Sequence, residues 1–122
     1  MRPKRHRLCT YVVAVEPAAT SAELLTLAAH FSSLRLAGCE VIVLDPAPKE
    51  ELEGRRRILR WVARHVALEG DVLQTAVDVA VTEKIIIGAP DTRYTAADVS
   101  SICKLLDRCE VVEPAEFVEP MP

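Results

Sequence analysis

The chain of 122 residues contains no asparagine, one glutamine, four glycines and few aromatic residues. Its apolar runs are all much shorter than the ~20 residues needed to cross a bilayer. The basic N-terminus lacks the apolar stretch of a secretory signal peptide. These absences predict a cytoplasmic protein without a membrane span. Gly88 is also the only glycine from Asp71 to the C-terminus, which excludes a glycine-rich phosphate cradle in that half of the chain.

Acidic residues are missing from the first seven positions, and basic residues are the minority afterwards. Residues 1–7 read as a basic N-terminal tail, whereas residues 8–122 hold eleven Lys and Arg against eighteen Asp and Glu. An acidic body argues against nucleic acid as a partner. The missing amides, an excess of arginine over lysine and eight prolines suggest a thermophilic source.

The cysteine pattern excludes the common zinc and redox motifs, because no CxxC pair occurs among Cys9, Cys39, Cys103 and Cys109. We expect buried thiols at these positions. Disulfides are the alternative, since the cytosol of hyperthermophiles can hold them. The sequence leaves open which of these states applies, and it predicts no metal site.

Apolar segments alternate with amphipathic ones along most of the chain. Runs rich in β-branched residues predict buried strands at residues 8–15, 39–44, 84–88 and 109–112. Residues 65–69 are either a short edge strand or the last turn of a helix, and we favour the strand. Helices are predicted over residues 20–37, opened by a Thr20–Glu23 capping box, from about 49, from 71 and over 95–108. In the second helix we place five arginines on the outer side: Arg55, Arg56, Arg57, Arg60 and Arg64. In the third helix, Asp71 is the expected N-cap, and the inward positions are Leu73, Ala76, Val77 and Ala80.

This order predicts an α/β fold: a single doubly wound, Rossmann-like three-layer sandwich with a mostly parallel sheet of 4–5 strands and about four helices. The domain spans residues 8–113. Residues 114–122, rich in proline and glutamate, form a C-terminal arm.

Acidic and polar residues follow the predicted strands, where parallel sheets build their ligand sites. Three acids at these ends could hold Mg²⁺ or transfer protons, although Asp-Pro and Pro-Asp pairs also form ordinary turns. The loop after Gly88 leads into a helix capped by Thr95, and Arg93 beside free helical amides is a plausible grip on an anion. We therefore propose a ligand site, with no catalytic residue assigned, at Glu16, Asp45, Gly88, Asp91, Thr92, Arg93 and Thr95.

Several stretches resemble the universal stress protein family. Residues 13–17 (VAVEP) are similar to the family's first strand and its acidic end, and residues 27–48 to its small-residue helix and second strand. Residues 70–76 (GDVLQTA) resemble its G-D-P-x-x-x-I stretch, and residues 84–88 (KIIIG) its later strand. The resemblance covers about residues 8–113. It implies a doubly wound α/β domain, usually dimeric, with a nucleotide site in some members.

The chain departs from the ATP-binding members of that family in the phosphate loop. Gly88 matches the first glycine of G-x-x-G, but Asp91 replaces the second, and Ser101-Ile102 replaces the later Gly-Ser pair. An aspartate there repels phosphate, and Pro17 removes an amide from the first loop. A nucleotide remains possible as a ligand, but we expect no ATP binding of the usual kind and no required cofactor.

The resemblance also implies how two copies meet, because the last strand of the family commonly pairs across a dimer. The corresponding interface residues here are Val111, Val112, Phe117 and Val118. The leading hypothesis is a homodimeric regulatory or interaction module with a possible protein partner. The alternatives are a nucleotide-binding hydrolase, which would use Glu16, Asp45 and Asp91, and a sensor of a nucleotide second messenger. The sequence does not identify a ligand or a pathway.

Overall fold

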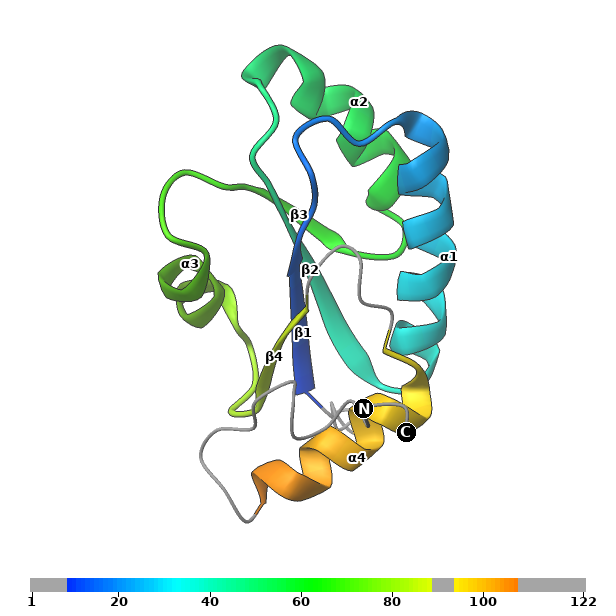
Figure 1. Cartoon of the computed structure of the whole chain (residues 1–122), viewed down its shortest axis with the longest axis vertical. Helices are drawn as coiled ribbons and strands as arrows, with labels where there is room; N and C mark the ends of the chain where they lie inside the picture. The colour runs from blue at the N-terminus through cyan, green and yellow to red at the C-terminus, as the bar shows by residue number, and fades with distance from the viewer. Residues whose placement is uncertain (1–8, 89–93, 108–122) are drawn as a thin grey trace, which may run out of the picture.

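Strands and helices alternate strictly in the computed structural model, which describes residues 9–88 and 94–107 (Figure 1). In chain order the elements are β1 (Cys9–Ala14), α1 (Ser21–Leu36), β2 (Cys39–Asp45), α2 (Lys49–Leu59), β3 (Arg64–Ala67), α3 (Val72–Val79), β4 (Ile85–Gly88) and α4 (Ala96–Leu106). None of these helices is long and apolar enough to cross a membrane. The predicted strand at 109–112, the basic tail and the C-terminal arm lie outside the described residues.

The described strands form one parallel sheet in the order β3-β2-β1-β4. The α/β prediction is confirmed, and so is the short edge strand, which runs from Arg64 to Ala67. β1 and β2 occupy the centre, where their continuous runs of Val, Ile and Leu are almost fully buried. Such runs fit a central parallel strand because both of its faces are covered.

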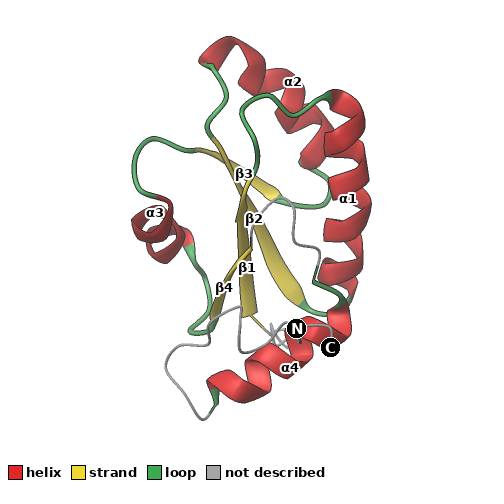
Figure 2. Cartoon of the chain, viewed as in Figure 1, coloured by secondary structure: helices red, strands yellow, loops and turns green. Residues whose placement is uncertain are grey.

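Helices cover both faces of the sheet unequally (Figures 1 and 2). α1, α2 and α4 pack on one face, in a core that includes Tyr11, Phe31, Leu59 and Val99. On the opposite face α3 packs through Ala76 against β1 and β2. The chain is therefore wound on both sides, as the alternation of elements predicts.

Side-chain caps set the starts of three helices where the sequence predicts them. Thr20 and Thr95 each accept a hydrogen bond from the amide of the third helical residue and receive a reciprocal carboxylate contact, from Glu23 and Asp98 respectively. Asp71 caps α3 through the amide of Gln74. Each cap satisfies amides that the first helical turn leaves without partners.

Two predicted helix faces are wrong. Arg55 does not lie on the outer side of α2: it is 6% exposed and points inward. Arg64 belongs to β3 rather than to the preceding helix, which ends at Leu59. In α3, Ala76 is buried as predicted, but Leu73 and Val77 are exposed. These two residues therefore do not belong to the face of α3 that packs on the sheet.

Candidate functional site

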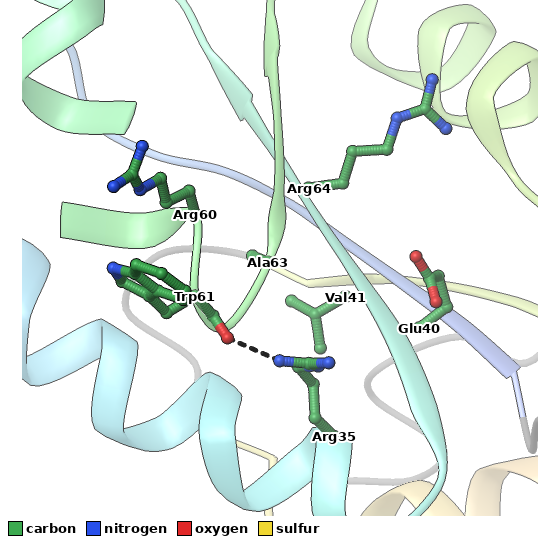
Figure 3. A pocket seen from close by; sticks show the side chains of 7 residues that line it. All are labelled: Arg35, Glu40, Val41, Arg60, Trp61, Ala63 and Arg64. Carbon is green, nitrogen blue, oxygen red and sulfur yellow. Dashed lines mark hydrogen bonds between the residues drawn. The ribbon is translucent and has the colours of Figure 1, made fainter. Parts of the chain in front are cut away.

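Surface hollows lined by described residues lie at opposite edges of the sheet. One, of about 400 Å³, lies at the amino edge between the ends of α1 and α2 (Figure 3). There Arg35 donates a hydrogen bond to the carbonyl oxygen of Trp61 at 2.6 Å, and the guanidinium of Arg60 lies 4.9 Å from the centre of the Trp61 ring. Arg64 points away from both (Figure 3). The positive groups of this hollow therefore do not converge on one position.

The other hollow, of about 290 Å³, lies at the carboxyl edge between the start of α1 and the inner side of α2, and Arg55 lines it. The strand order reverses between β1 and β4, because β2 and β3 continue on one side of β1 and β4 lies on the other. Parallel α/β domains bind ligands beside such a reversal, outside the carboxyl ends of the strands. The loops after β1, β2 and β4 are consequently the place to look for a site.

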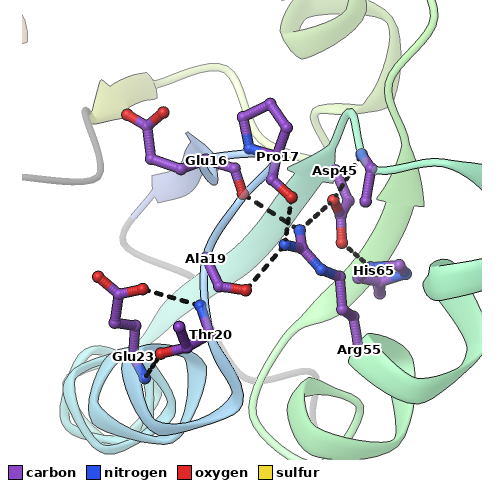
Figure 4. Close-up of polar contacts among 9 residues, drawn as sticks. Glu16, Pro17, Ala19, Thr20, Glu23, Asp45, Arg55 and His65 are labelled. Atoms are coloured by element: carbon purple, nitrogen blue, oxygen red, sulfur yellow. Dashed lines mark hydrogen bonds and ion pairs between the residues drawn. The ribbon is translucent and has the colours of Figure 1, made fainter.

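Asp45, the last residue of β2, is the centre of a buried polar cluster at this edge (Figure 4). Its Oδ1 accepts a hydrogen bond from Nη1 of Arg55 at 2.7 Å and another from the backbone amide of Ala47 at 3.0 Å. Its Oδ2 lies 2.8 Å from Nε2 of His65. The side chains of Asp45, Arg55 and His65 are 0%, 6% and 1% exposed. Both carboxylate oxygens therefore have partners from within the chain.

Arg55 joins this cluster to the loop between β1 and α1. Its Nη1 donates to the carbonyl oxygen of Glu16 at 3.2 Å, and its Nη2 donates to those of Pro17 at 2.7 Å and Ala19 at 3.0 Å (Figure 4). One guanidinium thus holds the loop, the end of β2 and helix α2 together. The fixed, planar array of donors makes arginine well suited to such a role.

The geometry of this cluster is that of a structural clamp. A carboxylate that binds Mg²⁺ or moves a proton must present an oxygen to the ligand, and Asp45 directs both of its oxygens at protein groups. The Glu16 side chain is exposed, and only its carbonyl oxygen takes part in the cluster. Among the described residues, no group of three or more His, Cys, Asp or Glu is arranged to hold a metal ion.

Gly88, at the end of β4, packs against the side chain of Tyr11. A Cβ atom at position 88 would lie 2.8 Å from Cζ of Tyr11 and closer still to its hydroxyl oxygen. Tyr11 is fully buried, so it could not move aside freely. Glycine at position 88 is therefore required by packing, whether or not a phosphate binds beside it.

Tyr11 belongs to an aromatic cluster with His30 and Tyr94. Its ring lies edge-on to both, with ring centres 6.2 Å and 6.3 Å away. His30 donates from Nε2 to the carbonyl oxygen of Tyr94 at 2.6 Å, which joins α1 to the residue just before α4. In the described part of the chain, the Tyr11 hydroxyl and Nδ1 of His30 are buried without a hydrogen-bond partner. Burial raises the pKa of Tyr11 above its ordinary value.

The predicted site residues are only partly assembled by the structure. Glu16, Asp45 and Gly88 lie at the carboxyl ends of neighbouring strands, as the sequence predicts. Thr95 caps α4 through Asp98. Asp91, Thr92 and Arg93 lie outside the described residues, as do the predicted interface residues Val111, Val112, Phe117 and Val118.

Arg55 and His65 are the members of the edge cluster that sequence reasoning missed. A signal was present for Arg55, because Leu52, Arg55 and Leu59 share one helical face at spacings of three and four residues. For His65 the signal was weaker. Finding it required two steps: recognising β3 as a strand, and pairing it with β2 so that His65 lies opposite Val43, near Asp45.

No known family model, curated protein or solved structure matches the chain, so its function has to be argued from this geometry.

Proposed function

We propose that the chain is a non-enzymatic regulatory or interaction module of the universal-stress-protein type, acting as a cytoplasmic homodimer. In this proposal it does not bind ATP in the usual way. The observation that carries the proposal is the enclosure of Asp45, at the carboxyl edge, by Arg55 and His65. The strand-end acid that a hydrolase would present to a metal or to water is here neutralised and covered by the chain itself.

The contact between Gly88 and Tyr11 supports the same proposal. In an ATP-binding loop, a glycine at this position would be explained by the close approach of phosphate to the backbone. Here the buried Tyr11 ring accounts for the glycine without a ligand. The alternative of a nucleotide hydrolase loses support, because it requires Asp45 to face a ligand.

Exposed apolar side chains favour a protein partner. Leu73 and Val77, one turn apart on α3, are 61% and 54% exposed, and Val81 just beyond the helix is 52% exposed. Apolar residues grouped on one helix face are typical of a contact with another protein. β4 is also an edge strand among the described residues, and such edges commonly pair with further strands.

Sedimentation velocity on the full-length protein over a range of micromolar concentrations tests the proposal. We expect a dimer, and we expect Phe117→Glu combined with Val118→Glu to shift it towards monomer. Leu25→Glu is the matched control, because it places the same acidic residue at an exposed apolar position on α1, outside the proposed interface. A monomer at every concentration, or turnover of ATP by the purified protein, would refute the proposal.

A further inference from the structure

Three of the four cysteines gather at the amino edge of the sheet. Cys9 is the first residue of β1, Cys39 is the first residue of β2, and Cys103 lies on α4. All three are buried, and none is in a disulfide. They come from segments far apart in the sequence: the parallel register of the sheet brings Cys9 and Cys39 together, and the packing of α4 on the sheet adds Cys103 to the same core cluster.

Cys9 and Cys39 are direct partners across the central pair of strands. The register places Cys9 opposite Cys39, and the Cys9 thiol donates a hydrogen bond to Sγ of Cys39 at 3.8 Å. Neighbouring strands lie about 4.8 Å apart, which is within the Cα separations that disulfides span, about 4.4–6.8 Å. A bond needs only the two sulfur atoms to approach each other, without any change of strand register.

We propose that Cys9 and Cys39 form a reversible cross-strand disulfide when the protein meets a hydroperoxide. This inference is independent of the proposed function. The disulfide would join the two central strands, β1 and β2, at their starts. Its expected effect is a more stable sheet under oxidising conditions.

Cys39 is the residue that attacks the oxidant. It is 5% exposed, whereas Cys9 is fully buried. The hydrogen bond from Cys9 lowers the pKa of Cys39, because it stabilises the thiolate, while the same contact and burial raise the pKa of Cys9. Cys39 also directly follows Gly38, a glycine with a positive φ of 107° in the turn that follows α1. Local opening at this turn would admit a small peroxide.

The reaction balances with the peroxide as the sole oxidant. The Cys39 thiolate attacks one peroxide oxygen, so that an S–O bond forms, the O–O bond breaks and the departing oxygen leaves as water after taking a proton. The sulfur of Cys9 then attacks the sulfenic sulfur of Cys39. The S–S bond forms, the S–O bond breaks, and a second water leaves with the Cys9 proton. Two thiols lose two electrons, and one hydrogen peroxide is reduced to two waters.

Cys103 makes the choice of partner testable. It lies near enough to Cys9 for each of the two thiols to affect the pKa of the other, so it is the competing partner of that residue. Cys9 and Cys39 face each other in a fixed register, whereas the backbone of α4 is not paired with β1. We therefore expect Cys39 to prevail over Cys103.

Peptide mapping of the oxidised full-length protein gives a direct answer. Trypsin separates all four cysteines into different peptides, residues 8–35, 36–49, 94–104 and 109–122. After treatment with hydrogen peroxide, alkylation of remaining thiols and digestion without reductant, we expect a linked 8–35/36–49 species that is two hydrogens lighter than the separate peptides. Dithiothreitol should abolish it. A link through Cys103 or Cys109, or over-oxidation without a link, overturns the proposal.

Thermal unfolding supplies the second measurement. Closing the loop from Cys9 to Cys39 should raise the melting temperature by about 5 °C or more, and reductant should reverse the rise. Cys103→Ser should keep both the link and the shift, whereas Cys39→Ser should lose both. An oxidised wild-type protein that melts at the temperature of the reduced one contradicts the stabilising role, even if the link forms.

Discussion

Replacing Arg55 with alanine should destabilise the protein severely. The guanidinium donates to the Asp45 carboxylate and to three loop carbonyl oxygens, at distances between 2.7 and 3.2 Å. Its removal leaves a fully buried carboxylate that retains only the Ala47 amide and His65. Breaking a buried ion pair from one side typically costs about 3–5 kcal/mol. For a chain of this length, that loss lowers the melting temperature by about 10–20 °C.

Urea unfolding at neutral pH measures this loss, and Arg57→Ala is the matched control. Arg57 lies two residues along the same helix, but its contact with Glu53 at 3.8 Å is exposed, so the control should change stability by about 0.5 kcal/mol or less. The double variant Asp45→Leu, Arg55→Met should be more stable than the sum of the two single losses predicts, because it leaves no uncompensated charge. An Arg55→Ala loss below about 1 kcal/mol would refute the clamp, since such a value is typical of an exposed pair.

Three further changes test the packing and the caps. Gly88→Ala should cost about 1–3 kcal/mol, because its methyl group would collide with the buried Tyr11 ring; an unchanged urea midpoint would show that the ring can move. Tyr11→Phe should be neutral or stabilising at pH 7, since it removes a buried hydroxyl without a partner in the described part. The raised pKa of Tyr11 means that the folded protein keeps a proton that the unfolded chain loses above about pH 10. Wild-type stability should therefore fall as pH rises beyond that value, and the fall should be shallower in Tyr11→Phe; equal slopes would contradict this assignment. Thr20→Ala should cost about 1 kcal/mol through loss of the α1 capping box, measured by thermal melting against Thr26→Ala, which lies in the helix interior.

The fold could be predicted because its signals are local. The strands β1 and β2 are continuous apolar runs, and Thr20, Asp71 and Thr95 mark helix starts by their side-chain chemistry. Each signal needs only a few neighbouring residues. The order of elements then limits the sheet to a parallel, right-handed arrangement.

The candidate site was harder to predict because its chemistry depends on distant pairings. Asp45 was expected at the carboxyl edge and lies there, but its burial depends on Arg55 and His65, ten and twenty residues away. A rule that places arginines on the outer side of a helix put Arg55 in solvent. The exception arises because a buried carboxylate and unpaired loop carbonyl oxygens need a donor. The sequence alone did not reveal that need.

The thiol cluster likewise combines a feature that local sequence predicts, burial, with one that depends on distant pairings, proximity. Each cysteine could be predicted to be buried from its apolar neighbourhood, and the structure confirms this for Cys9, Cys39 and Cys103. Their proximity follows from strand register, which sets Cys9 opposite Cys39. A shift of one residue would place the two side chains on opposite faces of the sheet.

Arg55 and His65 enclose Asp45 at the carboxyl edge, and on that ground we propose that the protein does not bind ATP there. A thermal-shift titration of the full-length protein with ATP, with and without Mg²⁺, tests it most directly. A ligand at ~100 times its dissociation constant adds about 2.7 kcal/mol of stability, which for this chain raises the melting temperature by roughly 10 °C. We predict no shift at millimolar ATP. A saturable shift that Asp45→Asn abolishes would contradict the account, because it would require Asp45 to face a ligand.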